Sequence, residues 1–242
     1  MSNRLVIIPT YNEAENIGHI LDAILRLPLS FDVLVVDDNS PDGTATLVEE
    51  KKQLYKDCIH LLSRSNKSGL GTAYIAGFKW ALARSYTHIF EMDADFSHNP
   101  KDLVRLFNAC EENDAQVSIG SRYVTGVNVV NWPMKRILLS YTASKYVKFI
   151  TGMPIHDTTA GFVCYKREVL TGINLDKIQF IGYAFQIEMK FKAYLKKFKI
   201  VEVPVIFTDR ERGKSKMNGR IISEAIFGVL KMKFKSLFGK EL

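Results

Sequence analysis

Two acidic residues separated by a single residue follow an apolar run near the middle of the chain. The run 88–92 leads directly into Asp93-Ala94-Asp95. In an extended segment, side chains at positions i and i+2 point the same way, so the two carboxylates would lie side by side and repel each other. Mg²⁺ or Mn²⁺ would remove that repulsion, because such ions accept a few carboxylates together with phosphate oxygens and water. Asp93 and Asp95 are therefore expected to be metal ligands that neutralise a departing diphosphate, the alternative being a solvated acidic turn.

Polar residues also follow three other apolar runs that have the character of strands. These sets are Pro9–Glu13, Asp37–Ser40 and Ser121–Tyr123. Each set alone is equally well explained as a loop with helix caps. Together with 93–95 they place polar groups after four strands, and open α/β sheets bind their ligands beyond the carboxyl ends of the strands. We therefore expect one ligand site at that edge.

A basic segment near the C-terminal end is the second candidate for diphosphate binding. It contains Arg210, Arg212, Lys214 and Lys216. Gly213 and Ser215 give the segment conformational freedom, so its cations are suited to closing over an anionic ligand. A solvated run of charges is the alternative interpretation.

Short apolar runs recur along the first half of the chain at intervals of about 26–29 residues, as expected for strands that alternate with helices. They are Leu5–Ile8, Val33–Val36, Ile59–Leu62, His88–Met92 and Gln116–Gly120. Helical patterns lie between them, and Asn12 with Glu15 resembles a capping box for the first helix. This rhythm predicts an α/β fold with an open, mostly parallel sheet and helices on both faces.

The second half of the chain has a less regular pattern. Helices are expected over 132–151 and 185–197, and strands over 160–165 and 200–207, where Pro204 indicates an edge strand. A final amphipathic helix is expected from Gly219 to Phe238. We therefore expect one domain over 1–218 and a basic C-terminal helix within 219–242, packed on the domain or on a membrane surface.

Charge is distributed unevenly along the chain. Residues 190–242 contain 14 Lys/Arg and 5 Asp/Glu, a net charge of +9, whereas the rest, with 19 basic and 21 acidic residues, has −2. A basic end favours anionic partners, and no motif indicates nucleic acid. No apolar run reaches the ~20 residues of a membrane span, so a cytoplasmic protein, peripheral on a membrane face at most, is expected.

Taken together, these motifs resemble the family 2 glycosyltransferases of GT-A fold, and more narrowly the polyprenol-phosphate (dolichol-phosphate) mannosyltransferases. The resemblance extends over nearly the whole chain. Its most specific parts are the run 37–44 (Asp-Asp-Asn-Ser-Pro-Asp-Gly-Thr) and the run from Asp209-Arg210 to Ser215-Lys216. The other matching segments are 9–13, 66–73, 93–100, 120–123, 131–132, 157–162 and 203–204.

The resemblance implies a Rossmann-like GT-A domain and a role for each matching residue. Asp93, Asp95 and Arg122 would be catalytic, the two aspartates through the metal. The nucleotide-sugar donor would contact Pro9, Tyr11, Glu13, Val36, Asp38, Asp93, Ala94, Asp95, Arg122, Arg210 and Lys216. Arg136 and Asp157 would bind the acceptor.

The implied reaction is inverting transfer of mannose from GDP-mannose to a polyprenyl phosphate, with Mg²⁺ or Mn²⁺ as cofactor. The acceptor phosphate is ionised near neutral pH, since its second pKa is about 6, so it needs no strong general base. Many members of the family have membrane spans or membrane partner subunits, so a membrane partner is possible here. Two alternatives stay open: transfer of glucose or an amino sugar from a UDP-sugar, and a non-catalytic module that binds nucleotide or lipid phosphate.

Overall fold

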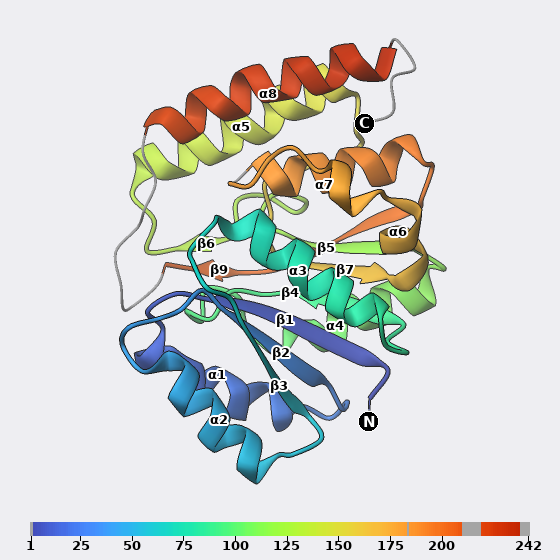
Figure 1. The fold of residues 1–242 in the computed structure, drawn as a ribbon. Helices are drawn as coiled ribbons and strands as arrows, with labels where there is room; N and C mark the ends of the chain where they lie inside the picture. Colours follow the sequence, from blue (N-terminus) through green and yellow to red (C-terminus); the bar gives the residue numbers. More distant parts are fainter. Residues whose placement is uncertain (1, 183, 210–218, 238–242) are drawn as a thin grey trace.

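The computed structural model describes residues 2–182, 184–209 and 219–237, with side chains given throughout except at 219–226. A seven-stranded sheet forms the centre of this part, in the order β3-β2-β1-β4-β7-β5-β8 (Figure 1). Its strands are β1 Arg4–Thr10, β2 Asp32–Asp37, β3 Ile59–Ser63, β4 His88–Glu91, β5 Val117–Ser121, β7 Val163–Lys166 and β8 Ile200–Pro204. The five apolar runs of the first half are thus confirmed as strands of an α/β fold.

Helices cover both faces of the sheet, as the sequence predicts. One face carries α1 Ala14–Leu25, α2 Thr44–Leu54 and α4 Asp102–Glu112. The other face carries α3 Leu70–Leu82, α5 Met134–Thr151, α6 Arg167–Gly172, a short 3₁₀ turn η1 Leu175–Lys177, α7 Ala184–Leu195 and α8 Gly219–Leu237. In Figure 1, α5 and α8 form the layer farthest from α1 and α2.

Strand β7 runs antiparallel to both of its neighbours, β4 and β5, whereas the other neighbouring pairs of the sheet are parallel. Its first residue, Val163, lies opposite Glu91, the last residue of β4. The amino end of β7 therefore lies at the edge where the parallel strands have their carboxyl ends. This reversal brings the segment 157–162 to the polar edge of the sheet.

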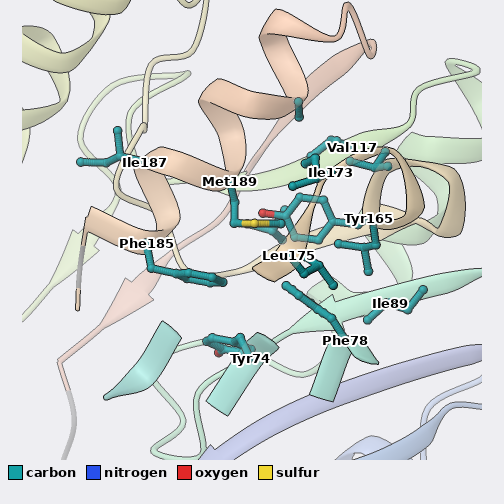
Figure 2. Packing of buried hydrophobic residues seen from close by; sticks show 14 of the residues in the cluster. Tyr74, Phe78, Ile89, Val117, Tyr165, Ile173, Leu175, Phe185, Ile187 and Met189 are labelled. Atoms are coloured by element: carbon teal, nitrogen blue, oxygen red, sulfur yellow. The ribbon is translucent and has the colours of Figure 1, made fainter. Parts of the chain in front are cut away.

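Aromatic side chains fill the core between the sheet and the helices α3 and α7 (Figure 2). The rings of Tyr74 and Phe185 stack with centroids 5.9 Å apart, and Phe78 meets Tyr165 edge-on at 5.8 Å. A Cβ added at Gly77 would lie 2.7 Å from Ile7 Cγ2, so only glycine allows α3 to approach β1 this closely. This packing fixes the strands whose ends carry the polar residues.

The predicted capping box at the start of the first helix is wrong. Asn12 has a φ of 61°, and α1 begins two residues later, at Ala14. The Ala14 N–H donates to Asp42 Oδ2 at 3.0 Å, and the Glu13 N–H donates to Thr44 Oγ1 at 3.0 Å. The residues 42–44 therefore replace the expected cap and join the loop after β1 to the loop after β2.

The strand expected over 200–207 is divided at its proline. β8 ends at Pro204, which lacks the N–H needed to continue a ladder, and β8 is the edge strand that this proline indicates. Phe207–Thr208 forms a separate strand, β9, which pairs with β6 Val129–Val130. This small second sheet lies beside the polar edge and leads the chain towards the basic segment.

Candidate active site

The carboxylate pair lies in a tight turn directly after β4. The Asp93 N–H donates to His98 Nδ1 at 3.2 Å, and the Ser97 N–H donates to Asp95 Oδ1 at 3.1 Å. Phe96 has a φ of 59°, a left-handed conformation that reverses the chain between these two contacts. The turn thus holds both aspartates at the end of the strand.

A buried histidine, His98, holds this turn by accepting the Asp93 hydrogen bond. The His98 ring stacks on Phe162 at a centroid distance of 4.8 Å and meets Phe207 edge-on at 5.3 Å. Burial lowers the pKa of His98 to about 4, so the ring is neutral near neutral pH and Nδ1 acts as an acceptor. His98 is therefore a structural residue of the turn.

The donor atoms of this turn fit a hard divalent cation. Asp93 and Asp95 supply carboxylate oxygens, and the buried Ser97 Oγ has no hydrogen-bond partner among the described residues. The described part of the chain has no cluster of three or more His, Cys, Asp or Glu side chains suited to a metal. An ion at the pair would therefore complete its coordination with ligand phosphates and water.

Arg122 and Asp157 form a buried, bidentate ion pair beside the turn. Arg122 Nε and Nη2 each donate to one Asp157 oxygen at 2.6 Å, and the Arg122 backbone N–H donates to the same carboxylate at 3.0 Å. Arg122 Nη2 also donates to Thr159 Oγ1 at 2.9 Å. This neighbourhood raises the pKa of Arg122 and lowers the pKa of Asp157, despite the opposing effect of burial. The predicted donor residue and the predicted acceptor residue are thus direct partners.

Two further charged residues hold the segment that contains Asp157. Glu202, on β8, accepts from the backbone N–H groups of His156 at 2.8 Å and Asp157 at 2.9 Å. Lys190, on α7, is fully buried and donates from Nζ to the Ala160 carbonyl oxygen at 2.6 Å. The position of the Arg122 guanidinium therefore depends on β8 and α7 as well as on its own strand.

Lys190 also lies in the electrostatic field of a buried carboxylate. Glu91 is the last residue of β4, two positions before Asp93, and its side chain is fully buried. Burial raises the pKa of Glu91, and the nearby Lys190 opposes that shift. Burial likewise lowers the pKa of Lys190, against the attraction of Glu91 and Asp157. Glu91 and Lys190 are therefore a buried pair in which burial disfavours the charged form of each group and their mutual attraction favours it.

The predicted donor-binding residues at the ends of β1 and β2 lie on the other side of the pair. Asp38 is buried and accepts from Arg64 Nε at 2.6 Å and Arg64 Nη2 at 3.0 Å. Lys67 Nζ lies 4.0 Å from the centre of the Tyr11 ring. Pro9 and Glu13 are partly exposed in the same region, whereas the Val36 side chain is fully buried in the core. Val36 thus has a packing role, and any contact from it to a ligand would be through its backbone.

Arg136 lies in the first turn of α5, and its guanidinium lies near the Trp132 indole, as does the guanidinium of Arg122. Its guanidinium carbon is 4.0 Å from the Trp132 ring centre, and that of Arg122 is 5.4 Å away. Arg136 Nη1 donates to Asp209 Oδ1 at 2.7 Å, and the Thr208 N–H approaches the Ser97 carbonyl oxygen at 3.4 Å. The residues that precede the basic segment therefore lie against the carboxylate turn.

The structure thus gathers Asp93, Ala94, Asp95, Arg122, Arg136 and Asp157 at one edge of the sheet, with Tyr11 and Asp38 at the neighbouring strand ends. Arg210 and Lys216 lie outside the described residues.

Sequence reasoning missed Arg64, Lys190 and Glu202. Arg64 follows β3 directly, so the search for polar residues at strand ends could have found it. Lys190 and Glu202 could not be found in this way, because the order of the strands in the sheet determines which residues they contact.

Comparison with known proteins shows the family to which the chain belongs. The family model for glycosyl transferase family 2 matches residues 5–173. Polyprenol monophosphomannose synthase from Mycolicibacterium smegmatis is 49% identical over 225 residues, which cover 93% of this chain and 84% of that relative. Undecaprenyl-phosphate mannosyltransferase from Micrococcus luteus is 45% identical over 225 residues, covering 93% of this chain and 91% of that relative.

Solved structures show the same fold at lower sequence identity. Glucosyl-3-phosphoglycerate synthase from Mycobacterium tuberculosis, in complex with phosphoglyceric acid, matches with a TM-score of 0.70 and 17% identity, covering 95% of this chain and 79% of that one. The same enzyme with Mn²⁺, UDP-glucose and phosphoglyceric acid gives a TM-score of 0.68 at 16% identity, covering 95% of this chain and 78% of that one. With the family model matching more than half of its length, this chain belongs to glycosyl transferase family 2.

Proposed function

We propose that this glycosyltransferase moves mannose from GDP-mannose to a polyprenyl phosphate, with inversion at the anomeric carbon. The carboxylate pair at the end of β4, next to the fixed Arg122, is the observation that carries the proposal. The names of the two relatives, at 49% and 45% identity, support mannose as the sugar and a polyprenyl phosphate as the acceptor.

In this proposal the donor lies across the carboxyl ends of β1, β2 and β4. Tyr11, with Pro9 and Glu13, faces the base, and Asp38 contacts the ribose end, with its carboxylate oriented by Arg64. The backbone at Ala94 approaches the diphosphate. Arg210 and Lys216 add positive charge from a segment outside the described residues.

Asp93 and Asp95 would hold Mg²⁺ or Mn²⁺, with Ser97 Oγ as a further oxygen next to them. Such an ion, when bound, supplies charge neutralisation for the diphosphate leaving group. The turn contributes preorganisation, because hydrogen bonds from Asp93 and Ser97 fix the backbone that carries both carboxylates. Arg122 adds a fixed positive charge that needs no reorganisation during the reaction.

The acceptor phosphate is its own nucleophile in this scheme, since its second pKa is about 6. The enzyme must therefore bring two anions together and align them, which is a task of positioning and charge compensation. Arg136, at the first turn of α5, is the residue assigned to the acceptor phosphate. Asp157 orients Arg122 through the bidentate pair, so its effect on the acceptor is indirect.

The proposal includes a peripheral location on the cytoplasmic face of a membrane, where a polyprenyl phosphate resides. No helix in the described part of the chain is long and apolar enough to span a bilayer. Residues 1–218 would form the transferase domain, and the C-terminal helix within 219–242 would pack on it at the membrane side. Whether the chain needs a membrane partner subunit is answered by assaying it alone.

Transfer of radiolabel tests the proposal. The purified chain is incubated with labelled GDP-mannose, Mn²⁺ and a polyprenyl phosphate, and the lipid is extracted into organic solvent. We expect label in the organic phase, and loss of at least about a hundredfold in rate for Asp95→Ala, as for removal of a charge-stabilising group. Parallel reactions with UDP-glucose and a UDP-amino sugar test the alternative donors. Label that stays in water with every donor, or an unchanged rate for Asp95→Ala, would refute the proposal.

A further inference from the structure

The paired helices α5 and α8 expose an unusual number of large apolar side chains. On α5, Phe149 is 85% exposed and Met134 is 76% exposed, and on α8, Phe227 is 71% exposed. The complete set is Met134, Leu138, Leu139 and Phe149 on α5, with Phe227, Leu230, Phe234 and Leu237 on α8. Elsewhere in the described chain, exposed large apolar residues such as Leu54 and Ile206 are scattered over separate elements, which is normal for a protein surface.

The burial pattern shows that these residues point away from the domain. Val147 of α5 and Val229 and Met232 of α8 are buried in one hydrophobic core. The exposed residues Phe227, Leu230, Phe234 and Leu237 follow helical spacing on the remaining face of α8. Each helix is therefore apolar on two faces, although only one of these faces is covered by the protein.

The two helices lie next to each other along the same side of the molecule (Figure 1). Lys233 Nζ of α8 donates to the Thr151 carbonyl oxygen at the end of α5, at 3.2 Å. The exposed residues therefore lie on two adjacent helices, and we call these eight residues the α5–α8 face. Many exposed apolar side chains gathered on adjacent helices typically bind a partner or a membrane.

The charge of the same helices selects between these partners. The two helices, residues 134–151 and 219–237, contain eight Lys or Arg residues and one acidic residue, Glu224. Lys135, Lys145 and Lys231 are exposed beside the apolar residues. Amphipathic helices with large apolar side chains and flanking lysines bind in the plane of anionic membranes, where each basic residue contributes roughly 1 kcal/mol.

We propose that the α5–α8 face docks on an anionic lipid bilayer, with α5 as an equal contributor to α8. This inference rests on the proposed function, because a polyprenyl phosphate acceptor requires the enzyme to work at a bilayer. The exposed residues define the surface that would bind there. Arg136 shares the first turn of α5 with Met134, so the end of the face adjoins Trp132 and the candidate acceptor site. A lipid phosphate can then reach Arg136 while its polyprenyl chain stays in the membrane.

Vesicle sedimentation tests the face with matched variants of the full chain. The chain is mixed with vesicles of phosphatidylcholine alone, or of phosphatidylcholine and phosphatidylglycerol in equal parts. We expect binding to the anionic vesicles, and a loss of roughly tenfold in partitioning for Phe149→Ser on α5 and again for Phe234→Ser on α8. Leu54→Ser, 73% exposed on α2, is the control and should bind like wild type.

Two further measurements separate this inference from the proposed function and from misfolding. Transfer to a short, water-soluble prenyl phosphate should be unchanged in Phe149→Ser and Phe234→Ser, which also shows that both variants fold. If wild type fails to bind anionic vesicles, or if Phe149→Ser binds like wild type, the inference is overturned even when transfer to the short acceptor is normal. If sedimentation equilibrium shows a dimer that these variants dissociate, the face is a contact between copies and the membrane assignment is also overturned.

Discussion

Two arginine–aspartate pairs lie near the Trp132 indole, and they differ in burial and in the number of hydrogen bonds. Arg122 and Asp157 have side-chain exposures of 10% and 0%, with two side-chain hydrogen bonds of 2.6 Å between them. Arg136 and Asp209 have exposures of 24% and 27% and share one bond of 2.7 Å. The first pair is tied to β8 and α7 through the segment 156–160, whereas the second joins α5 to the start of the basic segment.

This difference assigns different physical tasks to the two arginines. A buried bidentate pair is rigid, and breaking it leaves an uncompensated charge in a low dielectric. A partly exposed pair with one hydrogen bond contributes little to stability and can exchange its partner. Arg122 is therefore suited to preorganised charge, and Arg136 is suited to releasing Asp209 and binding an incoming phosphate.

Arg122→Met should have the largest effect, because it leaves Asp157 buried without its partner. We expect a loss of about 3–5 kcal/mol in the free energy of unfolding. Urea denaturation followed by circular dichroism measures this change. A loss below about 1 kcal/mol, the range of exposed pairs, would contradict the distinction between the two pairs.

Lys190→Met should have the next largest effect, because it removes a charge-assisted bond to the Ala160 carbonyl oxygen. We expect a loss of about 1.5–3 kcal/mol in stability, together with a lower kcat at unchanged KM for the donor. Lys192→Met is the matched control. Lys192 is also buried on α7, but its Nζ contacts the Lys177 carbonyl oxygen and Glu188, away from the segment 157–160. Equal losses of kcat per folded molecule in both variants would show that Lys190 has no specific positioning role.

The pH dependence of stability should also report the buried pair. The pKa of Asp157 is lowered in the folded protein, so its stabilisation is fully present above the ordinary Asp pKa of about 3.9 and is lost as pH falls through the folded value. The stability difference between wild type and Asp157→Asn should thus be constant above that pKa and shrink below it by up to about 1.4 kcal/mol per pH unit. Urea titrations at several pH values measure it. If the stability difference already shrinks between pH 7 and 5, a group other than Asp157 is responsible for it.

Arg136→Met should have the smallest effect on stability, about 0–1 kcal/mol, because its pair with Asp209 is partly exposed and has one hydrogen bond. Its effect on function should be larger and confined to one substrate. We expect a raised KM for the polyprenyl phosphate and an unchanged KM for GDP-mannose, measured in the organic extraction assay. A change in the KM for GDP-mannose alone would show that Arg136 binds the donor and not the acceptor.

The sequence allowed much of the fold to be predicted, because buried parallel strands appear as continuous apolar runs. The carboxylate pair and Arg122 were found by the same reasoning, since polar residues directly after such runs must lie at one edge of the sheet. The Arg122–Asp157 pair could not be derived in this way. It depends on β7 entering the sheet in reverse between β4 and β5, and nothing in the run 163–166 indicates strand direction or order.

The outer face of α5 was also beyond prediction from the sequence. Its apolar residues do not form a single stripe, so the pattern alone did not show which of them the domain would cover. The packing of α5 on α8 and on the core decides this, because it buries Val147 and leaves Leu138 and Phe149 exposed. The role of the basic segment, with Arg210, Arg212, Lys214 and Lys216, stays a prediction, since it lies outside the described residues.

We propose above that Asp93 and Asp95 hold the donor diphosphate through a divalent ion. Isothermal titration of GDP, with Mn²⁺ or with EDTA, tests this directly in wild type and in Asp95→Asn. We predict binding that requires Mn²⁺ in wild type and is weakened by at least about tenfold in Asp95→Asn, as expected when a metal site is impaired. Equal GDP affinity with Mn²⁺ and with EDTA, unchanged in the variant, would show that the diphosphate is bound without a metal at Asp93 and Asp95.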